Sequence, residues 1–455
     1  MINIIVAVSK QSNGKLGIGL GNTMAWKCLE ELSLFKEKTM GNVLIMGRST
    51  AENIPKLSGR EIYCLSRTHN KFIRVVTIGK NKVRMFNNVN DAIRDAREIH
   101  PNKKLFIAGG EQLYRVIMSQ YIEDINEIHI SYIKDAHRCD KFFDFIPNHQ
   151  NCICLSHSNH NEFTSYVLSP NKNTLNRGES EYLSTLERIT KQGELRDSRN
   201  GKVNSNFSTE HLLFNLENDA FPLLTTKKMF FRGIVEELLF FIRGETNSKL
   251  LEEKGIKIWK GNTSREFLDK KGFDYKEGEM GPMYGYQWRC FNGELDQLQK
   301  VIDQIKNDPY SRRILLTDYN PLQAEKGVLY PCHSIIIQFY VSKDIYLDMK
   351  VFNRSSDCFL GLPFNIASSS LLLMLIAKMC DLTPRNIYID LGDAHIYEQH
   401  LNQVKEQCSR FPYKFPKLKI EKDLSNISDI ENLEFKDFII EDYSHYPSIK
   451  GKMIA

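Results

Sequence analysis

The sequence lacks the features that mark several classes of protein. Its ten cysteines include no Cys-x-x-Cys pair, which argues against a zinc site or a disulfide scaffold and fits a reducing compartment. The longest apolar run, Leu371–Ala377, is too short to span a bilayer. Residues 1–8 have no basic leader and no cleavage site, so they predict a buried strand rather than a signal peptide. We therefore expect a cytoplasmic protein without a membrane segment or a bound metal.

The sequence also has little excess of charge of either sign. Lys and Arg number 61 against 56 Asp and Glu, for a formal net charge of +5. The excess lies in residues 1–168, which contain 22 basic and 16 acidic residues. This balance suits a small polyanionic ligand but falls far short of the basic surface of a nucleic-acid-binding protein. We expect small-molecule partners and no nucleic acid.

The composition is that of a soluble globular protein with more than one domain. Apolar residues make up 42% and charged residues 26% of the 455 residues, too long a chain for one ordinary core. The one credible boundary is the polar stretch 169–178, Ser-Pro-Asn-Lys-Asn-Thr-Leu-Asn-Arg-Gly. We expect domains at 1–168 and 179–455, joined by this linker.

The pattern of apolar residues differs between the two regions. In 1–168, short apolar segments alternate with amphipathic ones, which predicts an open α/β sheet with flanking helices. The expected strands are 3–8, 42–46, 62–66, 104–108, 127–132 and 163–168, and the expected helices are 28–39, 90–100 and 111–118. Region 179–455 combines strands with expected helices at 179–192, 234–243 and 366–380, which indicates an α+β domain on one large sheet.

The segment Tyr-Pro-Cys-His at 330–333 contains a candidate nucleophile. A thiolate is the best protein nucleophile near neutral pH, but a free cysteine is mostly protonated there, so cations must lower its pKa. The pairs 312–313 and 354–355 contain arginines that could do so. Considered alone, Cys332 is more easily explained as a small buried hydrophobe.

Neighbouring motifs favour the nucleophile. They are Asp308-Pro-Tyr-Ser-Arg-Arg313, Asn353-Arg-Ser-Ser-Asp357, Gly361-Leu-Pro-Phe-Asn-Ile-Ala-Ser368 and Gly392-Asp-Ala-His-Ile-Tyr397. On these motifs the region from about residue 179 onward resembles thymidylate synthase. The resemblance implies that dUMP is methylated by 5,10-methylenetetrahydrofolate, which leaves as dihydrofolate, and that Cys332 attacks carbon 6 of the uracil. It also implies a homodimer through the large sheet, in which Arg312 and Arg313 reach the other subunit's phosphate.

The same resemblance implies the other site residues of this region. Glu237 organises proton transfer and Tyr284 lies near the proton that leaves carbon 5; taken alone, Glu237 could be a surface residue, but 233–243 is too apolar for an exposed helix. The implied dUMP contacts are Arg199, Arg312, Arg313, Arg354, Ser355, Asn365, His395 and Tyr397, and the implied folate contacts are Trp259, Asn262 and Asp357.

The region departs from the family pattern in the length of two strands. The spacing from Cys332 to Gln338 is one residue longer than the family pattern, and the strand before Asn353 is also one longer. One extra residue turns every later side chain to the opposite face unless a bulge absorbs it. Matching insertions on neighbouring strands could instead extend a hairpin harmlessly. We expect this second arrangement, and we assign no role to Gln338.

Near the N-terminus, a possible buried carboxylate follows the segment Asn-Thr-Met-Ala-Trp at 22–26. Glu31 falls among apolar residues of an expected helix, and burial would raise its pKa and favour bonding to a protonatable heterocycle. The alternative is a solvated glutamate like Glu30. The glycines of Gly-Ile-Gly-Leu-Gly at 17–21 do not have the spacing of the dinucleotide fingerprint.

Further motifs make residues 1–168 resemble dihydrofolate reductase. They are Val43-Leu-Ile-Met-Gly-Arg-Ser-Thr50, Ser58-Gly-Arg60, Leu65-Ser-Arg67 and Phe106-Ile-Ala-Gly-Gly110 with Tyr114. The resemblance implies NADPH-dependent reduction of dihydrofolate to tetrahydrofolate, with Glu31 as the pterin-binding carboxylate. The implied folate contacts are Ile5, Ala7, Phe35, Arg60 and Ser131, and the implied NADPH contacts are Arg48, Ser49, Thr50, Ser66, Arg67, Gly109, Gly110 and Tyr114.

Together the two resemblances predict a bifunctional enzyme of folate and thymidylate metabolism. Three alternatives remain open. One is a cytidylate-specific second domain, against which Asn365 argues because an amide can both donate and accept. Another is an active reductase with an impaired synthase domain. The last is a non-catalytic RNA-binding or regulatory protein, against which the intact candidate residues and the lack of a basic face argue.

Overall fold

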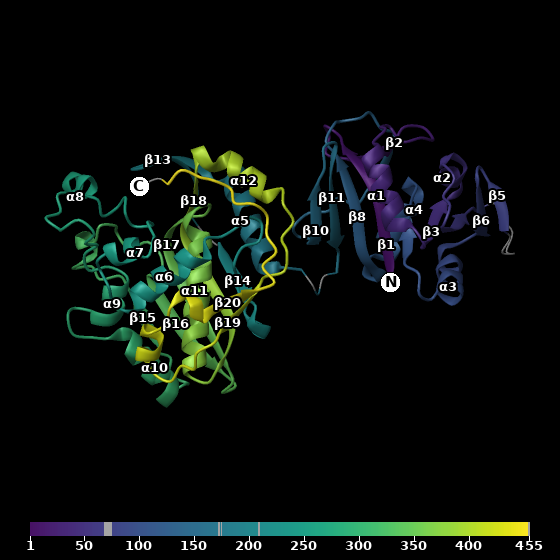
Figure 1. The fold of residues 1–455 in the computed structure, drawn as a ribbon. Coiled ribbons are helices and arrows are strands. Elements are labelled where there is room, and N and C mark those ends of the chain that lie inside the picture. Colours follow the sequence, from purple (N-terminus) through teal and green to yellow (C-terminus); the bar gives the residue numbers. More distant parts are fainter. Residues whose placement is uncertain (68–74, 172, 174, 208–209, 454–455) are drawn as a thin grey trace. The chain divides into compact units, whose positions relative to one another are not determined.

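The computed structural model describes residues 1–67, 75–171, 173, 175–207 and 210–453. They form two compact units, Met1–Leu175 and Asn176–Ala455, each built around its own mixed sheet flanked by helices (Figure 1). The predicted two-domain α/β plus α+β layout is therefore confirmed. The predicted linker, 169–178, contains the change from one unit to the other, and its limits stay a prediction.

The first unit is an open mixed sheet. Its strands are β1 (Ile2–Lys10), β2 (Leu16–Gly19), β3 (Val43–Gly47), β4 (Glu61–Leu65), β5 (Val75–Ile78), β6 (Asn81–Phe86), β7 (Leu105–Ile107), β8 (Ile125–Ile133), β9 (Lys141–Phe143), β10 (Ile153–Asn159) and β11 (Phe163–Ser169). Their order is β10-β11-β8-β1-β7-β3-β4-β6-β5, with β2 beside β1 and β9 beside β2. The central neighbours of β1 and β3 run parallel, and such strands read as continuous apolar segments because both of their faces are buried.

Four α-helices of this unit lie among the described residues. They are α1 (Leu29–Thr39), α2 (Arg48–Asn53), α3 (Val89–Ile99) and α4 (Glu111–Gln120), and a 3-10 turn, η1, spans Ile122–Asp124. Asn88 begins α3 by accepting a hydrogen bond from the Asp91 backbone N–H at 2.8 Å, which satisfies one of the free donors of a helix N-terminus. The predicted helices correspond to α1, α3 and α4. The short helix α2 was not predicted, because its sequence shows no helical spacing of apolar residues.

The second unit is built on one large sheet. Its strands are β12 (Glu194–Ser198), β13 (Gly201–Phe207), β14 (His211–Asn215), β15 (Leu315–Thr317), β16 (Ile336–Ser342), β17 (Tyr346–Asp357) and β18 (Thr383–Tyr397), and β19 (Lys417–Ile420) pairs with β20 (Phe438–Glu441) apart from them. The large sheet has the order β12-β13-β18-β17-β16-β15, with β14 beside β18.

The helices of the second unit surround its core. They are α5 (Arg177–Gln192), α6 (Phe231–Ile242), α7 (Lys249–Glu253), α8 (Arg265–Lys271), α9 (Gly285–Cys290), α10 (Gln297–Asn307), α11 (Gly361–Met379), α12 (Leu401–Cys408) and α13 (Ile427–Glu431), with 3-10 turns η2 (Glu217–Asp219), η3 (Ala324–Lys326), η4 (Glu398–His400) and η5 (Phe435–Asp437). Helix α11 contacts β17, β18 and α6. It is long and apolar enough to cross a membrane, but 78% of its apolar window is buried in this unit, so it serves as a core helix.

A bulge accommodates the unusual strand length after Cys332. The Ile335 backbone N–H donates to the Phe352 carbonyl at 2.9 Å, yet Ile336 is the residue paired with Phe352 in the ladder. Two residues therefore oppose one, the definition of a β-bulge, and the preceding Ser334 has a φ of +58°. Beyond the bulge the alternation is regular, with Ile337 buried and Gln338 exposed.

The outer face of the large sheet exposes apolar side chains. The strand registers place six of them on this face: Leu213, Leu315, Ile336, Tyr340, Phe352 and Tyr388. Each is more than a third exposed in the single chain. Polar residues such as Gln338 and Lys350 lie between them on the same face. Several exposed apolar side chains on one face are typical of a protein–protein interface.

Candidate active sites

Cys332 lies in the loop that leads into β16. The Ser355 backbone N–H, on β17, donates to the Cys332 carbonyl at 3.1 Å and holds the loop against the sheet. The Tyr284 hydroxyl is 3.5 Å from the Cys332 Sγ, and the Tyr284 ring stacks on His333 with 4.5 Å between ring centroids. The structure thus brings the predicted nucleophile and Tyr284 together.

A close approach between two helices positions Tyr284. This residue is the N-cap of α9 and has a φ of +45°, in a region that L side chains rarely adopt. The next residue is Gly285, where a Cβ atom would lie 2.4 Å from the Phe241 carbonyl oxygen on α6. Only glycine lets α9 approach α6 this closely.

Glu237 lies on α6 in the wall of the same site. Its Oε1 accepts a hydrogen bond from the Trp259 indole N–H at 2.8 Å, and the Trp259 and Tyr284 rings lie 6.0 Å apart. Burial raises the pKa of Glu237 to about 7, although the bond from Trp259 acts in the opposite direction. Glu237 is therefore no solvated surface residue, and Trp259 is its partner.

The charges around Cys332 correct one sequence-based expectation. Nearby arginines were expected to lower the pKa of this thiol. Burial instead raises it, and this effect outweighs the opposing influence of the Tyr284 hydroxyl and the Arg354 guanidinium. Arg312 and Arg313 are exposed at the start of β15 and form no side-chain hydrogen bond or ion pair within the described residues.

Arg354 is the arginine that the chain itself brings to this site. Its Nε donates to the Pro331 carbonyl at 3.1 Å, and its guanidinium lies 5.2 Å from the centroid of the Tyr330 ring. Ser355 follows on β17 beside the Cys332 loop. An arginine and a hydroxyl on one strand next to the thiol form a suitable phosphate-binding pair.

The ends of β17 and β18 add polar groups. Their register pairs Asp357 with His395, and the His395 Nδ1 lies 3.2 Å from an oxygen of Asp393. Asp357 accepts from the backbone N–H groups of Phe359 and Leu360, just before α11. Tyr397 follows on β18, and its pKa is raised by burial. Arg199 lies in the exposed β12–β13 turn and is close enough to oppose this rise.

Asn365 and Asn262 complete the predicted set. Asn365, on α11, lines a small cavity with His333, Ser334, Ser369 and others. Asn262 lies in the turn after Trp259, where its backbone N–H donates to the Trp259 carbonyl at 3.0 Å. Sequence reasoning assigned no role to His333, although its ring stacks on Tyr284.

In the first unit, Glu31 lies on α1 and is only 5% exposed. Burial raises its pKa, and the Ser131 hydroxyl acts against this rise by hydrogen bonding. Glu30, by contrast, is exposed and pairs with His160 at 2.8 Å. The alternative of a solvated Glu31 is therefore wrong.

The other predicted folate residues lie on elements near Glu31. Ala7 on β1 is paired with Ser131 on β8, and Phe35 on α1 packs in one cluster with Ile5. The guanidinium of Arg60 donates to the Thr39 hydroxyl at 3.2 Å, and burial lowers its pKa. The predicted folate residues of this unit thus lie on β1, α1 and β8 and on the segment before β4.

The predicted NADPH residues lie at the carboxyl ends of neighbouring strands. Gly47, at the end of β3, donates to the Gly109 carbonyl at 2.8 Å, and a Cβ on Gly110 would lie 3.1 Å from the Thr50 hydroxyl. Gly109 has a φ of +102° beside the Tyr114 ring, whose hydroxyl donates to the Ile5 carbonyl at 2.7 Å.

Among the polar side chains of this set, Arg48, Ser49 and Arg67 are exposed, Thr50 is half-buried, and Ser66 and Tyr114 are buried. Ser66, at the end of β4, is buried, and its backbone N–H donates to Phe86. Arg67 bonds to Gln112 at 3.2 Å, Arg48 pairs with Glu52 at 2.8 Å, and Ser49 faces Asn22 at 3.4 Å.

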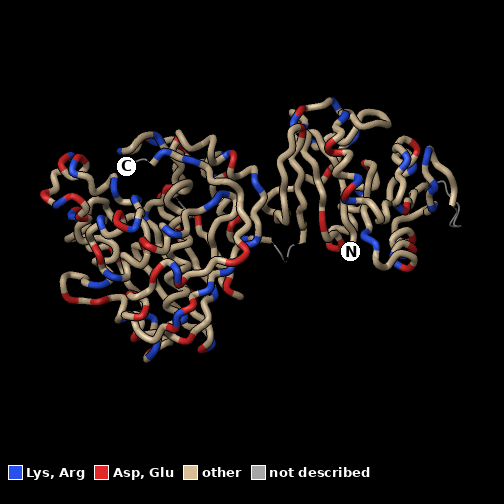
Figure 2. Tube along the Cα trace, in the orientation of Figure 1, with Lys and Arg blue, Asp and Glu red and all other residues tan. Residues whose placement is uncertain are grey.

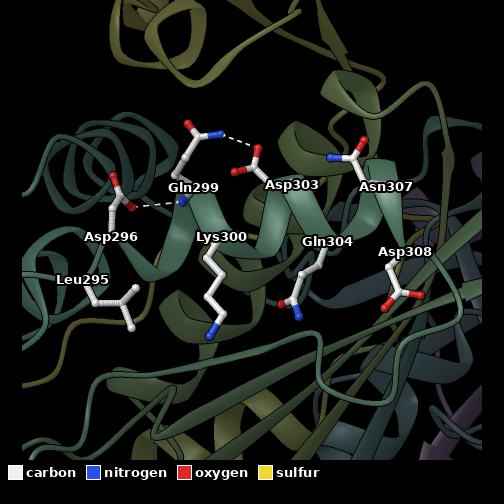
Figure 3. Close-up of a pocket in the computed structure, with 8 residues that line it drawn as sticks. All are labelled: Leu295, Asp296, Gln299, Lys300, Asp303, Gln304, Asn307 and Asp308. Atoms are coloured by element: carbon white, nitrogen blue, oxygen red, sulfur yellow. Dashed lines mark hydrogen bonds between the residues drawn. The ribbon is translucent and has the colours of Figure 1, made fainter.

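Other surface features fit a site less well. A shallow groove follows α10, lined by Leu295, Asp296, Gln299, Lys300, Asp303, Gln304, Asn307 and Asp308 (Figure 3). Asp296 and Asp303 are engaged there by Gln299, and the groove contains none of the predicted site residues. Over the described part of the chain, no cluster of His, Cys, Asp and Glu could hold a metal ion, and none of the ten cysteines forms a disulfide.

Comparison with known proteins agrees with this division. The thymidylate synthase family model matches residues 180–455, and the dihydrofolate reductase family model matches residues 1–170. The chain is 36% identical to a bifunctional dihydrofolate reductase-thymidylate synthase of Paramecium tetraurelia, covering 96% of each chain, and 34% identical to that of Leishmania major, covering 99% of this chain and 94% of the relative. Over 61% of its length it is 46% identical to the thymidylate synthase of Saccharomyces cerevisiae, 97% of which is covered. The chain therefore belongs to the bifunctional dihydrofolate reductase–thymidylate synthase family, as its motifs predicted, and is an enzyme with one domain of each kind.

Proposed function

We propose that the second domain methylates dUMP with 5,10-methylenetetrahydrofolate and that Cys332 is its nucleophile. The Cys332 Sγ attacks carbon 6 of the uracil, which makes carbon 5 nucleophilic towards the methylene group of the folate. The proposal rests chiefly on the Tyr284 hydroxyl 3.5 Å from the Sγ, with Arg354 beside the same loop. Because the free thiol has a raised pKa, its proton leaves as the carbon–sulfur bond forms, and a proton is taken up by the carbon-4 oxygen of the uracil, where the enolate charge develops.

Glu237 and Tyr284 handle protons in this account. A carboxyl group with a pKa of about 7 is protonated about half of the time at neutral pH, so it can both hold and release a proton. Glu237 therefore serves proton transfer to the pyrimidine ring. Tyr284, whose pKa is raised well above its ordinary value by burial, keeps its proton and donates a hydrogen bond near carbon 5.

The nucleotide and the folate occupy the surrounding residues. Asn365 reads the uracil edge, because its amide both donates and accepts. The remaining nucleotide contacts are Arg199, Arg354 and Ser355 for the phosphate, His395 and Tyr397 for the sugar, and Arg312 and Arg313 from the other subunit for the phosphate. The folate lies against Trp259, Asn262 and Asp357.

The first domain reduces dihydrofolate with NADPH. Glu31 binds the pterin and supports protonation of its nitrogen 5, because burial in this pocket favours the protonated carboxyl. Ile5, Ala7, Phe35 and Ser131 line the folate pocket, and Arg60 binds the glutamate tail.

Two exposed guanidinium groups and several hydroxyls fit the phosphates of NADPH, which supplies a hydride when bound. The residues that would hold it are Arg48, Ser49, Thr50, Ser66, Arg67 and Tyr114, with Gly109 and Gly110 allowing close approach of the backbone. The 2′-phosphate of NADPH would lie beside Ser66 and Arg67.

The chain acts as a homodimer through the outer face of the large sheet, with domains 1–168 and 179–455 joined by 169–178. The exposed apolar residues of that face support this arrangement.

Lys and Arg are interspersed with Asp and Glu along both units (Figure 2), which favours small-molecule partners over nucleic acid. We place the enzyme in the cytoplasm, without membrane attachment or metal.

Incubation of the purified protein with dUMP, methylenetetrahydrofolate and NADPH tests this function. The expected result is one thymidylate formed for each NADPH consumed, because the synthase produces the dihydrofolate that the reductase uses. Loss of both signals would refute the proposal. Turnover of dCMP in place of dUMP would favour the cytidylate-specific alternative. NADPH consumption with added dihydrofolate, but no thymidylate formation from dUMP, would favour an impaired synthase. RNA binding without turnover of either substrate would favour a regulatory protein.

A further inference from the structure

Asp318 is a buried carboxyl group without a partner. It is 1% exposed, and neither of its carboxyl oxygens accepts or donates a hydrogen bond within the described residues. A charged carboxylate in such surroundings is unfavourable, whereas a protonated one is neutral. The Asp318 carboxyl therefore holds its proton far more readily than an exposed aspartate.

The strand before it aims Asp318 at the Cys332 site. Ile314, Leu316 and Asp318 are buried while the intervening residues are exposed or half-buried, so Asp318 continues the inner face of β15. Helix α9 contacts β15, and Thr317 on β15 is paired with Ile336, so Asp318 lies beside the segment that joins Cys332 to β16. Tyr284, at the N-cap of α9, lies 3.5 Å from the Cys332 Sγ. Asp318 is within electrostatic reach of both Tyr284 and Cys332.

Asp318 and Cys332 share one cation. The Arg354 guanidinium lowers the pKa of both, and the Asp318 charge opposes ionisation of the thiol. Two acids close together and beside a single cation do not ionise independently, since the first negative charge disfavours the second. The titratable and charged groups that face Cys332 from the surrounding elements are Tyr284, Asp318, His333, Arg354 and Tyr397.

We propose that Asp318 is a positioning residue for the nucleophile: its buried carboxyl and the Cys332 thiol form a coupled acid pair beside Arg354, in which the carboxyl ionises first and its charge then opposes formation of the thiolate. The proposal rests on the proposed function insofar as Cys332 is the nucleophile. An ionised Asp318 carboxylate would interact with the Arg354 guanidinium and would repel the negative charge of the Cys332 thiolate, so the thiolate would form less readily.

Alkylation of Cys332 by iodoacetamide as a function of pH tests this pairing. The reaction follows the thiolate, and peptide mass spectrometry separates Cys332 from the other cysteines. In Asp318→Asn, which keeps the shape and removes the charge, the midpoint of alkylation is expected about one pH unit lower than in the wild type. Asp303→Asn removes an exposed carboxylate on α10 (Figure 3) and should leave the midpoint unchanged. An unchanged or raised midpoint in Asp318→Asn would overturn the proposal.

The wild-type profile provides a test that does not depend on a variant folding. Two coupled acids titrate in two steps, so the rate of Cys332 alkylation should rise over a wider pH range than one ionising group allows. A profile that fits a single ionisation would contradict the pairing. If dUMP is not turned over but the alkylation midpoint still falls in Asp318→Asn, the proposed function alone is refuted. If dUMP is turned over normally but the midpoint does not fall, the pairing alone is refuted.

Discussion

At the scale of single residues, burial decides what the acidic groups can do. Glu31 and Glu237 lie in walls that water reaches poorly, and each has a raised pKa for that reason. Both lie on helices beside glutamates that serve other purposes: Glu30 pairs with His160, and Glu236 pairs with Lys254 at 2.7 Å. In each pair, one glutamate thus has a raised pKa and the other forms an ion pair.

Replacing the nucleophile should separate the two activities. In Cys332→Ala, thymidylate formation should fall below detection, while reduction of added dihydrofolate should stay within about twofold of the wild type, because Glu31 and Cys332 lie in separate units. Both rates are measured on the same preparation, with circular dichroism as the check of folding. Equal loss of both activities in a folded variant would contradict the separation.

Removing the Glu31 carboxyl should act on the other activity. Glu31→Gln cannot exchange a proton, so reduction should fall by about 10²–10⁴-fold and thymidylate formation should persist. Glu30→Gln is the matched control, since this neighbour is exposed and should retain the reductase rate. Similar rates for the two variants would show that Glu31 has no special part in reduction.

The raised pKa of Glu237 predicts a dependence of stability on pH. Its folded pKa of about 7 lies above the value near 4.5 of an unfolded glutamate, so the folded state binds the proton more tightly. Its contribution is therefore fully present below about pH 4.5 and is lost as pH rises towards 7, by up to about 3 kcal/mol. Chemical denaturation of the second unit at several pH values should show a smaller loss over this range in Glu237→Gln. Equal slopes in the two proteins would contradict the assignment.

At the scale of elements, the close contact between α6 and α9 is the most demanding feature of the synthase site. In Gly285→Ala, the added Cβ would meet the Phe241 carbonyl oxygen, so α9 must shift and carry Tyr284 away from Cys332. The expected cost is about 1–3 kcal/mol in the free energy of unfolding, with lower thymidylate formation and normal dihydrofolate reduction. Gly261→Ala is the control, because nothing lies within 4 Å of the position of its Cβ. Normal thymidylate formation in Gly285→Ala would show that this contact does not position Tyr284.

The elements also show why the sequence predicted some features and not others. The central strands are continuous apolar segments, and β1, β3, β4, β7, β8 and β11 formed where they were expected. The edge strand β10 was missed because its Ser-His-Ser-Asn end is polar, and β5 and β6 were missed because they are short and partly exposed. Glu237 could be recognised from the apolar helix around it. The period-two burial of Ile314, Leu316 and Asp318 is a signal that could have located Asp318.

The charge environment of Cys332 could not be predicted from sequence. Motif order placed the arginines in the same domain as the thiol. The pKa of the thiol, however, depends on the distance from each charge to the sulfur and on how much water still reaches the sulfur. Arg354 reaches the loop through the Pro331 carbonyl, whereas Arg312 and Arg313 face away into solvent in the single chain. Desolvation is a property of packing, so the raised pKa emerged only from the structure.

At the scale of the whole molecule, the outer face of the large sheet should control both assembly and one activity. In Ile336→Asp with Phe352→Asp, two apolar residues that pair across β16 and β17 become charged, which should shift the protein from dimer to monomer in analytical ultracentrifugation. Thymidylate formation should fall with the dimer, because Arg312 and Arg313 would no longer reach the other subunit, while reduction should persist. Leu155→Asp, on the exposed strand β10 of the first unit, is the control. A fully active monomer would contradict the shared site.

The most direct test of the central claim is covalent trapping with 5-fluorodeoxyuridylate and methylenetetrahydrofolate. The fluorine cannot leave as a proton would, so the nucleotide should stay bonded to the attacking sulfur. We expect intact-protein mass spectrometry to show one nucleotide and one folate added per chain, with the adduct on the peptide that contains Cys332 and none in Cys332→Ala. An adduct on another cysteine, or no adduct in a folded protein that still reduces dihydrofolate, would contradict the assignment of Cys332.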